Sequence, residues 1–60
     1  MTGVVIIEPR KGGTWMMTVQ LDGKVIHRRA GIPDRDEART RAGVWTRECG
    51  YRLRIRKGES

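Results

Sequence analysis

The sequence predicts an α+β domain with a three- to four-stranded, mainly antiparallel sheet and one helix packed on one face. Short β-branched or alternating apolar segments occur before residue 30 and again after residue 50. Between them lies one segment whose apolar residues recur at helical spacing. Turn-forming residues separate all of these segments, so the predicted order is strand, strand, strand, helix, strand (β-β-β-α-β).

Length and composition restrict the chain to one small domain over residues 1–60, with residues 57–60 as a frayed tail. A chain of 60 residues buries only about 60% of its unfolded surface, so we expect marginal stability. The longest apolar run, Val4 to Ile7, is too short for a membrane span or a signal peptide core, and we expect a cytoplasmic protein. Cys49 is the one cysteine, which excludes an intramolecular disulfide.

The first three predicted strands form a meander. Residues 4–7 are apolar on both faces, and a basic loop over residues 10–13 follows. Residues 14–21 alternate in part, and Asp22-Gly23 is a strong signal for a two-residue hairpin turn into a third strand over residues 24–29.

A regular two-residue turn fixes which side chains share a face of this hairpin. On the expected core face, together with Trp15, it pairs Leu21 with Lys24, Val19 with Ile26, and Met17 with Arg28. On the expected open face it pairs Gln20 with Val25, Thr18 with His27, and Met16 with Arg29.

The helix is predicted to begin after residue 34 and to end before Gly50. Asp34 is a suitable N-cap, and Glu37 three residues later completes a capping-box-like pair. One apolar stripe of four residues should face the sheet, with Cys49 as a small buried hydrophobe: Ala38, Ala42, Trp45 and Cys49. Gly31-Ile32-Pro33 is expected to interrupt the sheet before this helix.

Residues 51–57 alternate strictly and predict a half-buried final strand with arginines on its open face. After the helix crosses back, this strand can lie parallel to the first strand and beside it. The resulting sheet order, 3-2-1-4, places the first strand inside the sheet, which suits its two-sided apolar character.

The net charge of +6 is distributed unevenly along the chain. Residues 34–49 contain four arginines and four acids, so the predicted helix is neutral overall and the whole excess lies on strands, turns and tail. Ten of the thirteen cations are arginine, whose planar fork suits phosphates and guanine edges. A positive sheet face of this kind attracts polyanions.

We therefore expect a nucleic-acid-binding module, with double-stranded DNA favoured over RNA as the partner. The expected contact residues are Arg10, Lys11, His27, Arg29, Arg52, Arg54 and Arg56. The acids are scattered and the histidine has no second ligand near it in the sequence, so we expect no catalytic residue and no metal site. The hypothesis thus includes no enzyme activity, no cofactor, no small-molecule substrate and no membrane partner.

An alternative hypothesis comes from apolar residues that share the expected open face. Val4, Ile6 and Met16 would form a small apolar patch there, which is typical of contact with another protein. The chain would then be a protein-interaction module, either a homodimer or a phage-type inhibitor of a host protein.

Part of the sequence resembles the small arm-type DNA-binding domains at the N-termini of phage tyrosine integrases. The resemblance covers residues 14–49 and lies in Trp15 at a strand start, Leu-Asp-Gly-Lys at 21–24, and Gly-Ile-Pro-Asp-Arg-Asp-Glu-Ala at 31–38. That family resembles plant AP2 domains, with three strands and a helix behind them, and inserts the outer sheet face into the major groove. Asp34 stands where the family usually has threonine, and one strand is additional, either the one before Trp15 or the one after Gly50, depending on the alignment. The resemblance implies a phage or bacterial accessory module that binds DNA.

Overall fold

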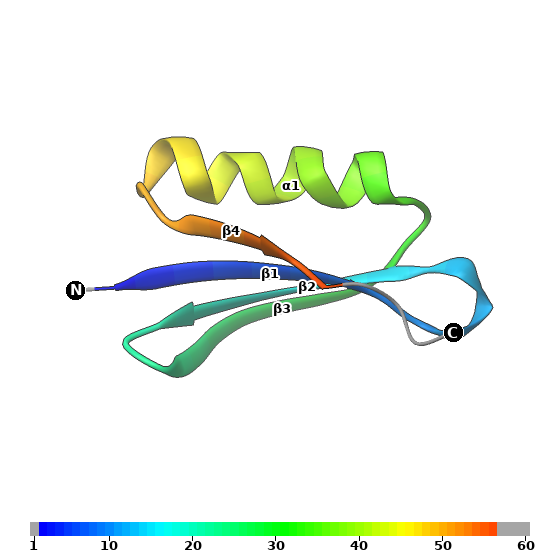
Figure 1. Ribbon diagram of the computed structural model, residues 1–60, viewed down its shortest axis with the longest axis horizontal. Helices are drawn as coiled ribbons and strands as arrows, with labels where there is room; N and C mark the ends of the chain where they lie inside the picture. The colour runs from blue at the N-terminus through cyan, green and yellow to red at the C-terminus, as the bar shows by residue number, and fades with distance from the viewer. Residues whose placement is uncertain (1, 57–60) are drawn as a thin grey trace.

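β1 (Gly3–Pro9) lies inside the sheet, with a neighbouring strand on each side (Figure 1). In the computed structural model, which describes residues 2–56, it pairs antiparallel with β2 (Trp15–Leu21) and parallel with β4 (Arg52–Ile55). β3 (Lys24–Ile32) completes the sheet, whose order is β3-β2-β1-β4. The predicted α+β class and strand order are therefore confirmed, while the tail expected at 57–60 lies outside the described residues.

The hairpin turn between β2 and β3 has the predicted conformation. Asp22 and Gly23 have φ values of 53° and 84°, as a two-residue turn with two left-handed positions requires. The turn also holds the start of β1: the Thr2 N–H donates to Asp22 Oδ1 at 2.8 Å, and the Asp22 N–H donates to the Thr2 carbonyl at 2.8 Å. These two bonds help to fix the register of β1 against β2.

The predicted register of β3 is correct only next to the turn. Leu21 lies opposite Lys24 and Gln20 opposite Val25, but Val19 lies opposite His27 because Ile26 is an inserted bulge residue. A second irregularity separates the pair Met17–Arg29 from the pair Trp15–Ile32.

β3 also extends beyond the end expected for it. It runs through Gly31, whose φ of 72° lies in the left-handed region, to Ile32, which is 2% exposed and belongs to the core. The sheet therefore continues past Gly31, where the sequence predicted an interruption. Glycine adopts the left-handed conformation that the second irregularity of β3 requires, so the strand does not end there.

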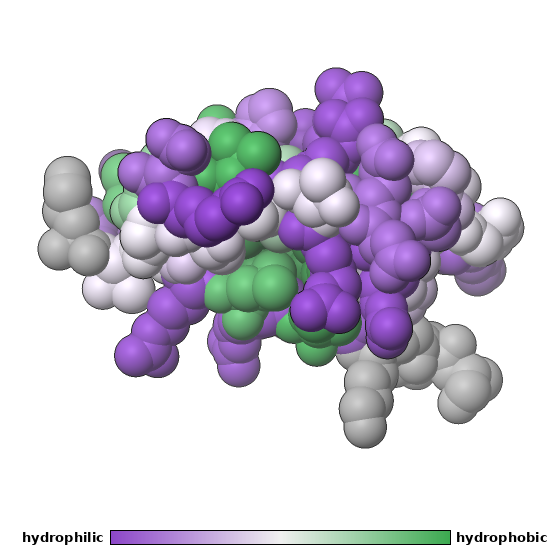
Figure 2. Space-filling model, turned by 90° about the horizontal axis from the view of Figure 1, so that it is seen from above, coloured by the Kyte–Doolittle hydropathy of each residue, from purple (hydrophilic) through white to green (hydrophobic). Residues whose placement is uncertain are grey.

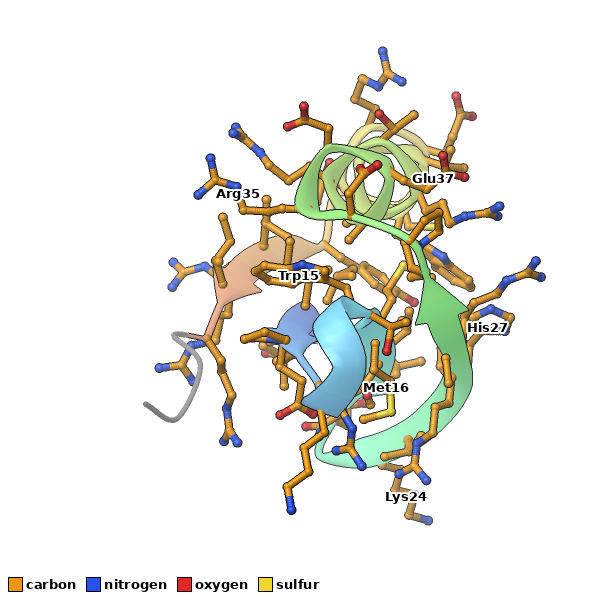
Figure 3. All side chains as sticks on the ribbon, turned by 90° about the vertical axis from the view of Figure 1, so that its right-hand side faces the viewer. Trp15, Met16, Lys24, His27, Arg35 and Glu37 are labelled. Atoms are coloured by element: carbon orange, nitrogen blue, oxygen red, sulfur yellow. The ribbon has the colours of Figure 1, made fainter. Side chains whose placement is uncertain are left out.

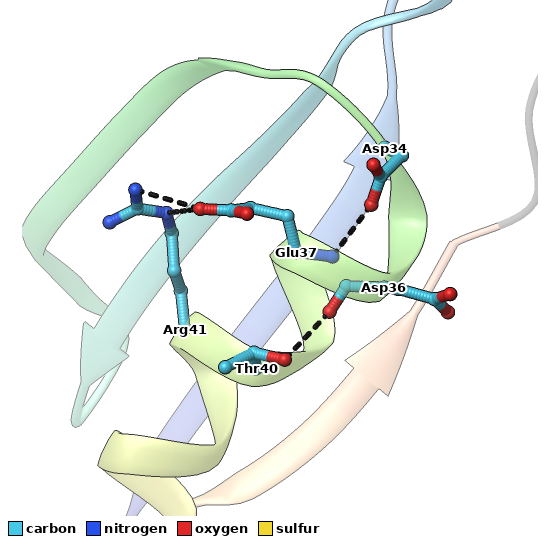
Figure 4. Close-up of polar contacts among 5 residues, drawn as sticks. All are labelled: Asp34, Asp36, Glu37, Thr40 and Arg41. Carbon is cyan, nitrogen blue, oxygen red and sulfur yellow. Dashed lines mark hydrogen bonds and ion pairs between the residues drawn. The ribbon is translucent and has the colours of Figure 1, made fainter.

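α1 (Arg35–Glu48) begins at the predicted cap (Figure 4). Asp34 Oδ1 accepts a hydrogen bond from the Glu37 N–H at 2.8 Å. The Glu37 carboxylate does not complete a capping box; it pairs with Arg41 one turn later, with Oε2 2.9 Å from Nη2. Both side chains of this ion pair are about two-fifths exposed, so its contribution to stability is only about 0.3–0.5 kcal/mol.

Two alanines allow α1 to pack closely on the sheet. Ala38 and Ala42 are completely buried and face a core of large side chains from the strands: Val5, Ile7, Met17, Val19 and Ile32. The prediction that Cys49 continues this buried stripe is wrong. Cys49 is the C-cap residue and is exposed, because the helix ends there and Gly50, with φ of 71°, turns the chain towards β4.

The surface on the helix side is mainly hydrophilic, with small separate hydrophobic patches (Figure 2). Exposed large apolar residues on α1 and β4 are Val44 at 52%, Leu53 at 38% and Ile55 at 46%. The outward side of α1 therefore presents no continuous apolar surface in this view. The part of the chain that the structure describes contains no helix long and apolar enough to cross a membrane.

The first testable prediction concerns the contact between Gly3 and the ring of Tyr51. A Cβ atom at Gly3 would overlap that ring, including its Cγ, so Gly3→Ala must displace the ring from its stack with Trp45. We expect Gly3→Ala to lower the free energy of unfolding by about 1–3 kcal/mol, measured by urea denaturation.

Gly43→Ala is the matched control for this substitution. A Cβ there meets only the Arg47 Nη2 at 3.9 Å, an ordinary contact, and the position is helical. Alanine should therefore raise the stability by about 0.5–1 kcal/mol. A Gly3→Ala variant as stable as the wild-type chain would contradict the packing of Tyr51 described here.

Candidate functional site

The face of the sheet away from α1 is left uncovered by the described residues. Strand pairing and the lining of a hollow on this side define the open face by its residues: Val4, Ile6, Glu8, Met16, Thr18, Gln20, Val25, Arg28, Arg52, Arg54 and Arg56. Their chain neighbours Val5, Ile7, Met17 and Val19 point to the other side and are buried under the helix. The open face therefore follows from the alternation of side chains along each strand.

The arginine row of β4 lies on the open face. Arg52 is opposite Val4 and Arg54 is opposite Ile6, while Arg56 follows in the same alternation and its N–H donates to the Ile7 carbonyl at 2.9 Å. All three arginine side chains are exposed. Along an extended strand, the Cα atoms of alternate residues are about 6.6 Å apart. The three arginines therefore form a regular row of positively charged side chains along β4.

Arg28 joins this row on the open face, although the sequence suggested the core face for it. It lies opposite Thr18 because the bulge at Ile26 shifts every later residue of β3 by one position. Among residues 2–56, Arg41 and Glu37 form the only ion pair closer than 4 Å. Arg28 and the arginines of the β4 row therefore have no carboxylate partner among these residues.

His27 and Arg29 do not lie with the arginine row, and their expected place on the open face is wrong. His27 is opposite Val19 and Arg29 opposite Met17, both of which face the helix. The His27 ring lies against Trp45, with ring centroids 5.5 Å apart. The same bulge that brings Arg28 to the open face therefore removes these two residues from it.

Arg10 and Lys11 lie in the connection between β1 and β2, where Lys11–Gly13 forms a short 3-10 turn. β1 and β4 run parallel, so this connection is at the same end of the sheet as Arg56 (Figure 1). Both side chains are exposed. The expected loop cations are therefore at one end of the arginine row, while Lys24 lies at the other hairpin end, far from the helix (Figure 3).

The helix has arginines on the side of β4 as well. Figure 3 shows Arg35 on the same side of α1 as β4, with Glu37 on the opposite side towards β3. Arg39, one turn after Arg35, belongs to the same side of the helix. Figure 4 shows the Asp36 carboxylate on the side of α1 opposite Glu37 and Arg41, so this side of the helix carries an acid as well as arginines.

β3 curves around β2 (Figure 3), and the open face contains a hollow lined by residues of these two strands, of β1 and of the chain directly after β4. The hollow has a volume of about 170 Å³ and is lined by Ile6, Glu8, Met16, Thr18, Gln20, Val25, Arg28 and Arg56. Thr18 is 7% exposed, although its side chain is polar. Val4, Ile6 and Met16, the expected apolar patch, are on this face and are each half-buried.

Sequence reasoning missed the hollow and the contribution of Arg28 to it. Both depend on the bulge at Ile26, and no residue type near Ile26 indicates that a bulge is present. Met17 lies opposite an arginine in both registers: Arg28 in the regular hairpin and Arg29 in the structure. The contact that distinguishes the two registers is tertiary, between His27 and Trp45.

Comparisons with protein-family models, with characterised proteins and with solved structures give no match to this chain. The chemistry of the site is therefore argued from its own residues. Within residues 2–56, no three metal-ligating side chains (histidine, cysteine, aspartate or glutamate) are gathered in one place.

The second testable prediction concerns His27. Because its ring packs on Trp45, His27→Ala should lower the free energy of unfolding by about 0.5–1.5 kcal/mol in urea denaturation. His27→Phe keeps an aromatic ring at this place and should retain most of that stability. If His27→Ala and wild type unfold at the same urea concentration, the contact contributes nothing and the placement of His27 is wrong.

Proposed function

We propose that the chain is a small DNA-binding module that contacts the duplex through the open face of its sheet. The observation that carries the proposal is the row Arg52, Arg54 and Arg56, exposed and without carboxylate partners among the described residues. Arg28 on the same face and Arg10 and Lys11 at its end extend the positive charge. Arginine in such a row suits phosphates and the edges of guanine.

Dimensions also support a duplex as the partner. The described chain measures 34 × 20 × 16 Å, and its long axis is comparable to one turn of B-DNA, about 34–36 Å. One such molecule can therefore contact successive phosphates along one side of a duplex. As a phage or bacterial accessory module with cytoplasmic DNA as its target, the chain would act by binding and without a catalytic step.

The alternative of a protein-interaction module receives less support. Val4, Ile6 and Met16 are half-buried, so little apolar surface remains for a partner or a second copy at that place. The exposed large apolar residues are distributed over three elements, with Val25 and Ile26 on β3 at 47% and 48%. Arginines on the same face favour an anionic partner over an apolar one.

The third testable prediction is the salt dependence of DNA binding. Neutralising four to six phosphates with the cations named above gives a slope of about −4 to −5 for log K against log salt concentration. The triple variant Arg52→Gln, Arg54→Gln, Arg56→Gln should reduce the magnitude of the slope by about 3 and the affinity by the order of 100-fold at moderate salt. Fluorescence anisotropy with a labelled 16-bp duplex measures both.

The matched control removes the same charge from the helix, as Arg39→Gln, Arg41→Gln, Arg47→Gln. These three arginines are on α1, away from the open face, so affinity should fall much less than in the β4 variant. Equal losses in the two variants would indicate non-specific attraction by net charge. Absence of binding to wild type at low salt would exclude the proposed function altogether.

A further inference from the structure

The hollow on the open face has a lining unlike that of a simple phosphate-binding surface. Apolar walls from Ile6, Met16 and Val25 surround polar groups of Thr18 and Gln20, and Arg28 and Arg56 contribute the positive charge. We propose that this hollow binds one unstacked pyrimidine base of a DNA strand. The proposal rests on the proposed function, because it assigns a place for a base on the face that would contact DNA.

Size favours a single-ring base. The hollow offers about 170 Å³, and a protein cavity of about 150 Å³ accommodates a molecule the size of benzene. A six-membered ring with small substituents fits this volume. The fused double ring of a purine is larger than benzene, so a single-ring base is the closer match to this volume.

Thr18 contributes a hydroxyl to the lining of the hollow. Thr18 is 7% exposed, and within residues 2–56 the threonine hydroxyls that donate hydrogen bonds are those of Thr40 and Thr46. No fully enclosed side-chain oxygen or nitrogen of the described residues lacks a partner, so the Thr18 hydroxyl must reach the open space of the hollow. The hydroxyl is therefore available to donate or accept a hydrogen bond with a molecule that enters the hollow.

Gln20 follows Thr18 on the same face of β2 and adds a second polar group to the lining. Its side-chain amide has both a donor and an acceptor, as the hydrogen-bonding edge of a pyrimidine does. The apolar walls can contact the two ring faces and the thymine methyl group. The polar and apolar residues of the lining therefore offer partners for both the edge and the faces of one base.

The charges distinguish a base from a bare phosphate. Arg28 comes from β3 and Arg56 from the end of β4, so they approach the hollow from different strands and can contact phosphates on either side of an inserted nucleotide. Glu8 also lines the hollow and lies more than 4 Å from both guanidinium groups. A carboxylate there repels a phosphate placed inside, whereas it can accept a hydrogen bond from a pyrimidine donor, the N3–H of thymine or the amino group of cytosine.

The test uses the full chain and three labelled duplexes that differ at one bulged position: an unpaired thymine, an unpaired adenine, or an abasic residue. An already unpaired base avoids the cost of unstacking from a pair. We expect the thymine bulge to bind about tenfold more tightly than the abasic duplex in fluorescence anisotropy, with adenine close to the abasic value.

Thr18→Val removes the hydroxyl and preserves the shape of the side chain, and it should reduce the tenfold preference for thymine to less than threefold. Thr40→Val is the control, because Thr40 is on the outer side of α1 and its hydroxyl donates to the Asp36 carbonyl. Thr40→Val should keep the preference. Gln20→Leu removes the other polar side chain and should also lose the preference for thymine. This variant provides the test if Thr18→Val does not fold.

The outcomes separate this inference from the proposed function. If all three duplexes bind equally and binding still depends on Arg52, Arg54 and Arg56, the hollow does not receive a base and only the inference is overturned. A preference that survives both Thr18→Val and Gln20→Leu would also overturn it. If no duplex binds, the proposed function fails, and the inference fails with it.

Discussion

β4 pairs in parallel with β1, and this pairing determines what the uncovered side of the sheet presents. β1 is apolar on both faces, so its inner residues Val5 and Ile7 can be buried under the helix while Val4 and Ile6 remain on the other side. Since side chains in register point the same way, Arg52 and Arg54 must accompany Val4 and Ile6. A shift of one residue in β4 would send these arginines to the helix side of the sheet and bring Leu53 and Ile55 to the open face.

The packing that maintains this arrangement is modest, as expected for so short a chain. Seven buried apolar residues form the core of the described chain, and two of them are the alanines that bring α1 close to the sheet. At the end of the helix, Trp45 contacts both His27, with ring centroids 5.5 Å apart, and Tyr51, at 5.9 Å. This group of three rings connects β3, α1 and the approach to β4, and so it joins the two edges of the sheet through the helix.

Much of the fold could be predicted because its signals are local. The turn at Asp22-Gly23, the cap at Asp34 and the left-handed Gly50 each depend on the residue type at one position. The parallel strand and its arginine row followed from strict alternation combined with a first strand that needed neighbours on both sides. In these cases the residue pattern leaves one favourable arrangement.

The errors arise where tertiary contacts decide. His27 and Arg29 were assigned to the open face by a regular hairpin, but one inserted residue, Ile26, exchanges them with Arg28. Cys49 has the correct spacing for the buried stripe, yet the helix ends at that position and leaves it exposed. The hollow likewise depends on how β3 curves around β2. The spacing of residue types along the sequence does not specify this curvature.

The proposed DNA-binding site combines a part that the sequence predicts, the arginine row, with a part that only the three-dimensional structure shows, the hollow beside it. An NMR titration of the isotopically labelled chain with a duplex examines both parts in one experiment. Binding through the open face predicts the largest amide shifts in residues 52–56, together with Thr18, Gln20 and Arg28, and small shifts along the outward side of α1. Shifts concentrated on residues 36–47 of the helix, with the sheet unchanged, would contradict the assignment of the binding face.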